Sequence, residues 1–156
     1  MFNIILYNPQ IPPNTGNIVR LCSNTGCKLH LIKPLGFNLN IKSFRRAGLD
    51  YHALSEIFEY ENLDDCLLSL KPSNFFIVTK FGTKNYSEVN YFENDALIFG
   101  SETKGLPQEI IDRFPSERKL LIPMVQSSRS INLSNAVSIV VYNAWKNIKY
   151  KGSANK

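Results

Sequence analysis

The chain has 156 residues, 44% of them hydrophobic, so it can bury one core of ordinary domain size. Its 18 Lys and Arg against 13 Asp and Glu give a net charge of +5, which favours polyanionic partners without requiring one. Three cysteines without a CxxC pair argue against a disulfide framework or a zinc cluster, and we expect a reducing cytoplasm. Because the chain has neither a basic start nor about 18 uninterrupted apolar residues, we expect no secretion and no membrane spanning.

Short apolar runs rich in β-branched and aromatic residues alternate with helical patterns along the chain. The runs predict strands at 2–7, 29–33, 75–80, 96–100 and 119–123. The helical patterns cover 14–25, a weaker stretch at 43–47, 63–70, 107–114 and 132–148. This alternation predicts an α/β fold with a parallel sheet covered on both faces. We expect a single domain over residues 1–150 and a flexible tail at 151–156.

The first predicted helix directly follows a strand and has two different sides. Asn14 or Thr15 can cap its start, and Gly26 suits a left-handed residue at its end. One side is apolar, and the other is polar and carries Asn17, Arg20 and Asn24. Ligands bind at the carboxyl ends of strands in open α/β sheets, so the polar side is a candidate site. On this segment alone, a solvated helix face is the better interpretation.

The segment 99–107 leads from an apolar strand into a helix. Gly100 and Gly105 permit close backbone approach or positive φ, which a bound ligand or a tight chain crossing needs. The loop is neither a phosphate-binding P-loop nor GxGxxG, since Lys104 precedes its glycine and no Ser or Thr is placed to hold magnesium. Glu102 is expected either to order this loop or to fix an arginine or a backbone amide.

A loop dense in short polar side chains follows the last predicted strand. Between Ser128 and Asn135 it holds five Ser and Asn residues around one arginine, whereas a helix cap needs only one. We interpret this segment as a ligand loop. The helix after it has a broad apolar stripe, for which core packing is the simpler interpretation and a second subunit the alternative.

Three motifs follow one another along the chain, at 14–20 (NTGNIVR), at 99–107 (FGSETKGLP) and from 122 (IPM) to 136 (SINLSNA). With 45–52 (RRAGLDYH), they make almost the whole chain resemble the SpoU branch of the SPOUT methyltransferases. The resemblance implies a SPOUT-type parallel sheet with a C-terminal trefoil knot, an exception to the rule that chains do not thread their own loops. It also implies S-adenosylmethionine as cofactor, S-adenosylhomocysteine as product, no metal, and a homodimer.

Without an added RNA-binding domain, the chain looks like the members of this family that methylate a ribose 2′-hydroxyl of tRNA. Their target is the wobble cytidine or uridine, and leucine isoacceptors are the expected substrates. Carried over position by position, the family's cofactor contacts fall on strand ends and on the polar loop. These positions are Val78, Thr79, Gly100, Ile122, Met124, Ser130 and Leu133. Backbone groups there can bind an adenine edge, and the apolar side chains can wall its ring.

The resemblance assigns catalysis to Arg20, Ser130 and Asn132, with Arg20 as the base. The pKa of a guanidinium lies above about 12, so Arg20 is a poor base and can instead bind phosphate and stabilise a developing alkoxide. RNA contacts are expected at Asn17, Arg20, Arg45, Arg46, Arg129 and Tyr142, with Lys42 and Lys104 as further phosphate contacts. For Tyr142, core packing is the simpler interpretation.

Three alternatives remain open. An enzyme of the same fold can modify ribosomal RNA or another tRNA position, and a noncatalytic RNA-binding protein can use the same scaffold. The presence of Arg20, Asn132 and the glycine-containing loop argues against the latter. An unrelated α/β nucleotide-binding domain would bind cofactor without RNA and show little salt dependence. Ser101 and Lys104 stand where the family often has proline and arginine, which bears only on RNA affinity.

Overall fold

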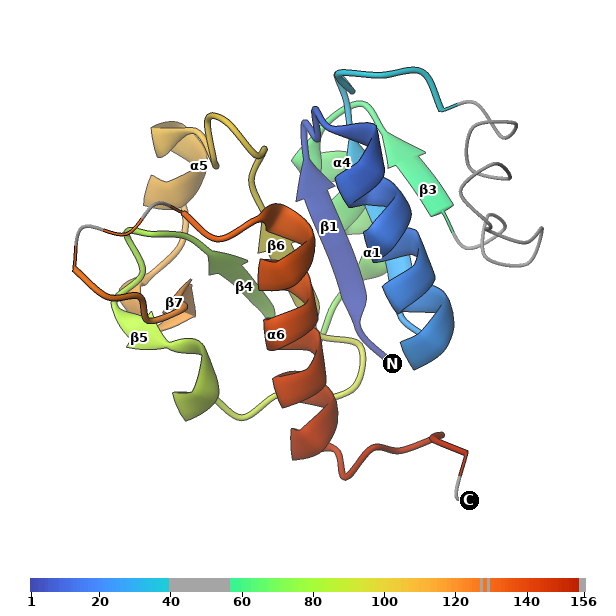
Figure 1. Cartoon of the computed structure of the whole chain (residues 1–156), viewed down its shortest axis with the longest axis vertical. Helices are drawn as coiled ribbons and strands as arrows, with labels where there is room; N and C mark the ends of the chain where they lie inside the picture. Colours follow the sequence, from blue (N-terminus) through green and yellow to red (C-terminus); the bar gives the residue numbers. More distant parts are fainter. Residues whose placement is uncertain (40–56, 127, 129, 155–156) are drawn as a thin grey trace.

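The structure, a computed structural model, describes residues 1–39, 57–126, 128 and 130–154. Within them, a parallel sheet has the strand order β3-β2-β1-β6-β4-β7-β5 (Figure 1). Its strands are β1 (Asn3–Tyr7), β2 (Lys28–Ile32), β3 (Ile57–Tyr60), β4 (Phe75–Val78), β5 (Lys84–Asn85), β6 (Ala96–Phe99) and β7 (Lys119–Leu121). The helices are α1 (Pro12–Thr25), α4 (Leu63–Leu70), α5 (Gln108–Asp112) and α6 (Leu133–Asn147), with 3-10 turns at Tyr86–Glu88 and Ser116–Arg118.

The five predicted strands are confirmed, as are the four predicted helices that fall within the described residues. The weak helix expected at 43–47 lies outside them. Two strands, β3 and β5, were not predicted. They form the two edges of the sheet, where Phe58 and Glu59 are exposed and Lys84 and Asn85 are half-buried. Edge strands bury little, so their sequences lack the continuous apolar run that marks a central strand.

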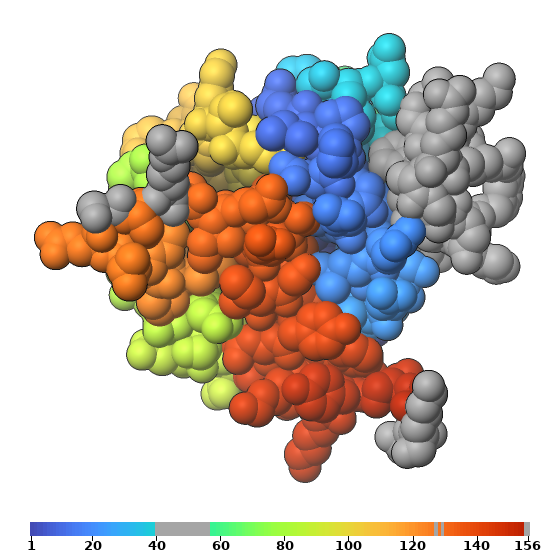
Figure 2. Space-filling model, in the orientation of Figure 1, coloured from blue at the N-terminus to red at the C-terminus, as the bar shows by residue number. Residues whose placement is uncertain are grey.

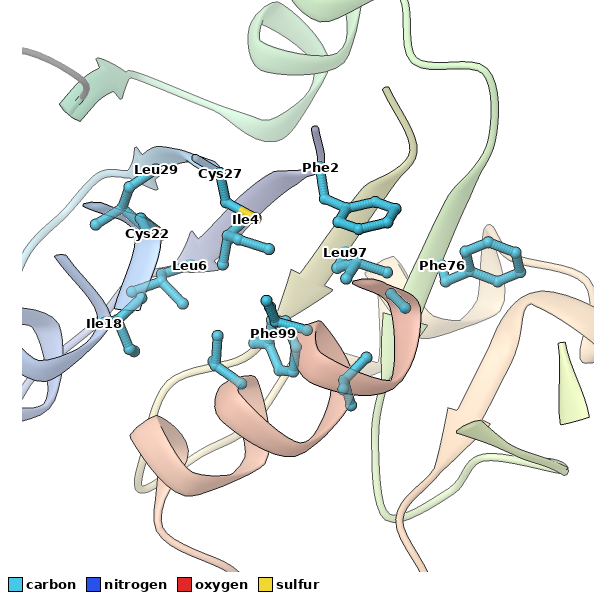
Figure 3. Close-up of a cluster of buried hydrophobic side chains, with 14 of the residues drawn as sticks. Phe2, Ile4, Leu6, Ile18, Cys22, Cys27, Leu29, Phe76, Leu97 and Phe99 are labelled. Atoms are coloured by element: carbon cyan, nitrogen blue, oxygen red, sulfur yellow. The ribbon is translucent and has the colours of Figure 1, made fainter. Parts of the chain in front are cut away.

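Helices cover both faces of the sheet, as predicted. In each central strand, alternate residues point to opposite faces. In β1, for example, Ile4 and Leu6 pack in the cluster that includes α1 and α6, while Ile5 packs against α4 and α5. Figure 3 shows the first cluster, with labelled side chains from α1, β1, β2, β4 and β6. Figure 2 shows α1 and α6 beside each other on this face of the molecule, and the two helices are in contact.

The apolar stripe of α6 packs into the core, as its simpler interpretation predicted. Val137, Val140, Val141 and Ala144 are completely buried there. Trp145, near the end of α6, donates its indole N–H to the carbonyl of Lys151, which follows the helix, at 2.9 Å. The chain is therefore anchored to α6 up to the first residue of the predicted tail.

The C-terminal end of α1 follows the sequence prediction, and the N-terminal end does not. Gly26 ends the helix with φ +70°, as expected. The start was predicted wrongly, because Ile11 is the N-cap and makes no side-chain capping bond. Proline at the first two helical positions begins the helix earlier than Asn14, since its fixed φ suits the first turn and its missing N–H costs no bond. Asn14 and Thr15 therefore lie inside the helix, where both are buried.

The carboxyl ends of β1, β4, β6 and β7 meet at one edge, because all four strands are parallel. The loop after β4 is held against β7: the Thr79 N–H donates to the Leu120 carbonyl and the Thr83 N–H to the Lys119 carbonyl, each at 3.0 Å. A Cβ atom on Gly82 would overlap the Leu120 backbone, so only glycine fits this crossing. The strand order places β7 between β4 and β5; the trefoil knot itself stays a prediction.

Candidate active site

A cavity of about 190 Å³ lies at the carboxyl ends of β4, β6 and β7, next to the start of α6. All the residues to which the resemblance assigned cofactor contacts line it. They are Val78, Thr79, Gly100, Ile122, Met124, Ser130 and Leu133. The parallel sheet brings these segments together because each of them follows the carboxyl end of a strand. The cavity therefore combines backbone groups at strand ends with apolar walls.

Several further lining residues were not predicted. Lys80 and Phe81 come directly after Thr79, and the Lys80 ammonium lies 5.0 Å from the centre of the Phe81 ring. Phe81 is 57% exposed, so its ring is accessible from solvent at the cavity wall. Its position two residues after Thr79 is the nearest signal in the sequence, but that position does not indicate whether the ring turns toward the cavity. Leu106 and Ala136 add to the apolar walls, as does Ile131, which lies in the polar loop between Ser130 and Leu133 where cofactor contacts were expected.

The glycine-containing loop after β6 is tightly closed. Ser101 and Gly105 exchange two backbone hydrogen bonds, of 3.2 and 2.9 Å. A Cβ atom on Gly100 would overlap the backbone of Gly105 and Leu106, while Gly105 itself has φ +68°. The two uses of glycine predicted for this loop, close backbone approach and positive φ, are thus both confirmed.

Glu102, in the same loop, binds the start of α1. Its carboxylate accepts hydrogen bonds from the backbone N–H of Gln10 at 2.8 Å, from that of Ile11 at 3.1 Å and from Asn14 Nδ2 at 3.0 Å. The predicted contact with backbone amides is confirmed. Because α1 has neither a capping side chain nor an acidic residue in its first turn, Glu102 supplies the negative charge that a helix N-terminus favours.

Asn132 is the N-cap of α6. Its Oδ1 accepts from the Ser134 N–H at 2.9 Å and from the Ser134 hydroxyl at 2.7 Å. Its Nδ2 donates to Asn14 Oδ1 at 2.9 Å. One residue of the polar loop therefore does the capping, and it also connects α6 to α1. Ser130 lies nearby in the cavity wall and is exposed.

The residues assigned to catalysis and RNA binding are not all in one place. Arg20 and Asn17 lie on the exposed polar side of α1, as the helix pattern predicted, and neither lines the cavity. Lys104 does line the cavity and is exposed. Tyr142 is 47% exposed and packs edge to face on Trp145, with ring centres 5.8 Å apart, so core packing was the wrong interpretation. The remaining predicted contacts, Lys42, Arg45, Arg46 and Arg129, lie outside the described residues.

The three cysteines are buried and free. Burial raises the pKa of each thiol, and that of Cys66 reaches about 12. Among the described residues, no group of three or more His, Cys, Asp or Glu side chains could hold a metal ion. In the same part of the chain, no helix is both long and apolar enough to cross a membrane.

Similar proteins are known by sequence and by structure. The tRNA (cytidine(34)-2′-O)-methyltransferase of Yersinia pestis is 53% identical over an alignment of 161 positions, which covers 100% of this chain and 99% of that protein. The Escherichia coli K12 protein of the same name is 52% identical, with 98% of each chain covered. A structure solved to study 2-OH methylation of C/U34 on tRNA has a TM-score of 0.86 and 37% identity, and the match covers 96% of this chain and 97% of that one.

More distant structures share the fold. The SpoU methyltransferase AviRb of Streptomyces viridochromogenes, solved in complex with AdoMet, has a TM-score of 0.80 at 19% identity. The match covers 97% of this chain and 58% of that one, and at this identity it supports the α/β SPOUT-type fold alone. The sequence profile of the SpoU rRNA methylase family matches residues 1–142. The chain therefore belongs to the SpoU methylase family, as its three motifs predicted.

Proposed function

We propose that this protein transfers a methyl group from S-adenosylmethionine to the ribose 2′-hydroxyl of the wobble cytidine or uridine of tRNA. One observation carries the proposal: the residues assigned to the cofactor come from separate segments and line a single cavity at the carboxyl edge of the sheet. The similarity over the full length to enzymes named for this reaction supports the choice of tRNA over ribosomal RNA. We expect leucine isoacceptors as substrates and a cytoplasmic location.

The cavity suits S-adenosylmethionine in its chemistry. Val78, Ile122 and Leu133 offer apolar walls to an adenine ring, and the Thr79 and Ser130 hydroxyls offer partners to polar groups. S-adenosylmethionine supplies an electrophilic methyl group on a positively charged sulfonium. In the reaction the methyl group would pass to the ribose oxygen, S-adenosylhomocysteine would be released as the product, and the proton of the hydroxyl would pass to solvent.

The residues of this chain then have to orient the ribose and stabilise the charge on its oxygen. Ser130 is exposed in the cavity wall and can hold the ribose by a hydrogen bond, which places the oxygen in line with the methyl group. We assign to Arg20 the binding of phosphate and the stabilisation of the developing alkoxide, because a guanidinium is a delocalised cation with several hydrogen-bond donors. Asn132 orients this region from the N-cap of α6.

Arg20 does not line the cavity of its own chain, and a partner subunit would bring an arginine to it. We propose a homodimer in which the α1 of one subunit approaches the cavity of its partner. The arrangement also doubles the basic surface that meets the tRNA. With a net charge of +5 per chain and exposed Lys80 and Lys104 at the cavity, we expect binding to tRNA to weaken steeply with salt.

The test incubates the purified protein with S-adenosylmethionine and total tRNA from a strain that lacks this methylation, and maps ribose methylation by mass spectrometry. Wild type should methylate the wobble cytidine or uridine. Arg20→Ala and Ser130→Ala should lose most of the activity. Lys28→Ala should keep it, because Lys28 is exposed at the amino end of β2, whereas the cavity lies at the carboxyl ends of the strands. Methylation of ribosomal RNA alone, or cofactor binding without any methylated RNA, would refute the proposal.

A further inference from the structure

Three segments that meet beside the cavity are joined by one chain of hydrogen bonds. Asn14 Nδ2 donates to Glu102 in the loop after β6, at 3.0 Å, and Asn14 Oδ1 accepts from Asn132 Nδ2 at the start of α6, at 2.9 Å. The two partners lie 88 and 118 positions away in the sequence. Asn14 is therefore the single residue of α1 whose side chain connects both elements in the described structure.

The amide of Asn14 is the group that this position requires. It must donate to a carboxylate and accept from a neighbouring amide at the same time, which a carboxylate, a hydrocarbon or an ammonium side chain cannot do. Its role is separate from helix capping, because the Asn14 N–H already donates to the Ile11 carbonyl at 3.1 Å, within the first turn. Asn14 is only 6% exposed, so water cannot easily replace either bond when one is lost.

Both partners of Asn14 are part of the cavity or adjoin it. Glu102 lines the cavity, and Asn132 directly precedes Leu133, which also lines it. On the other side, Asn14 belongs to the same continuous helix as Arg20. A ligand that shifts the Glu102 loop or the start of α6 therefore also acts on the helix that carries Arg20, through the two bonds of Asn14.

We propose that Asn14 is a positioning residue that couples occupancy of the cavity to RNA binding by α1. The inference rests on the proposed function and extends it: with the cofactor or its product in the cavity, Glu102 and Asn132 hold α1 in the orientation that binds tRNA. Without the Asn14 amide, the cavity and the helix still form, but α6 loses its bond to α1 and the Glu102 loop keeps only its bonds to Gln10 and Ile11, so the coupling weakens. By linkage, bound tRNA must raise the affinity of the cavity by the same factor.

The test measures the dissociation constant of tRNA by filter binding, with and without saturating S-adenosylhomocysteine, for wild type and Asn14→Ala. For wild type we expect the product to tighten tRNA binding by about fivefold or more, the lower end of common coupling effects. In Asn14→Ala this ratio should fall well below the wild-type value. Asn90→Ala is the control, since Asn90 is exposed, does not line the cavity and is not part of α1. Asn14→Asp, which keeps the acceptor and loses the donor, should lower the ratio as well.

A merely structural role for Asn14 predicts a different result, in which both affinities or the melting temperature fall while the ratio is preserved. That outcome, or a wild-type ratio of one, would overturn the inference. Failure of wild type to bind S-adenosylhomocysteine, measured by calorimetry without RNA, would instead contradict the proposed function.

Discussion

His30 lies in β2 with 1% of its surface exposed, and its ring stacks on Phe58 at 5.2 Å. Asn3 donates through its Nδ2 to Asn94, so its Oδ1 is an acceptor for the His30 Nε2–H at 3.3 Å. His30 Nδ1 has no partner within the described residues, and protonation would turn it into a buried, unpaired donor. Burial, with a smaller contribution from the positive charge of Lys28, lowers the pKa of His30 from 6.5 to about 4.

This shift makes the stability of the fold depend on pH in one direction. Between pH 6.5 and about 4 the unfolded chain binds a proton at His30 and the folded chain does not. The free energy of unfolding therefore falls as the pH drops through this window and is unaffected by His30 above it. At about 1.4 kcal/mol per pKa unit, the loss is about 2 kcal/mol at pH 5 and approaches about 3 kcal/mol near pH 4.

Urea unfolding at pH 7 and pH 5 checks this prediction when wild type is compared with His30→Gln. Glutamine keeps a donor for Asn3 and does not titrate. Other titrating groups are common to both proteins, so they cancel in the comparison. Wild type should lose about 2 kcal/mol more than the variant between the two pH values. Equal losses in the two proteins would refute the reasoning, whatever the stability of the variant at pH 7.

Three further changes have defined outcomes. The Thr15 hydroxyl is buried without a hydrogen-bond partner in the described structure, so Thr15→Val should raise the unfolding free energy by about 1 kcal/mol in urea titrations, and a decrease would contradict this. Gly100→Ala forces a Cβ atom into the Gly105 backbone, so it should lower the free energy of unfolding by about 2 kcal/mol or more and abolish S-adenosylhomocysteine binding. Gly105→Ala, with open space around the new Cβ atom but a positive φ, should lower the free energy of unfolding by about 1 kcal/mol. The three buried thiols should stay unreactive toward a disulfide reagent at pH 8 until the protein unfolds.

The positions that line the cavity were predictable because of a simple property of parallel sheets. Val78, Gly100 and Ile122 each stand at or just after the end of a buried apolar run, and parallel strands bring all such ends to one edge. The family resemblance then assigned the cofactor to these positions. Phe81 was missed because nothing within a short loop predicts which way an aromatic side chain turns, and its place in the cavity wall depends on β7 packing against the loop through Gly82.

The contacts of Glu102 show where local sequence rules stop. The sequence identified it as an acid that binds a loop amide, yet no local pattern indicates that its partners lie 88 to 92 positions earlier. Capping rules count only the residues next to a helix, and by those rules Asn14 was expected to cap α1. The rule failed because prolines begin α1 two residues before Asn14, and a distant carboxylate binds the amides of Gln10 and Ile11 just before the helix. The Asn14 side chain is thus available for a different contact.

The start of α1 is thus completed by a loop of the cavity rather than by its own sequence. A helix with a local cap keeps its first turn whatever happens elsewhere, but the first turn of α1 is held by the Glu102 carboxylate through Gln10 and Ile11. Any movement of the glycine-containing loop therefore changes the support of the helix that carries Arg20. Local rules are expected to fail at functional sites, because groups there serve a partner across the fold instead of their neighbours in the chain. In this protein the failed capping prediction at Asn14 marks the residue that connects the cavity to α1.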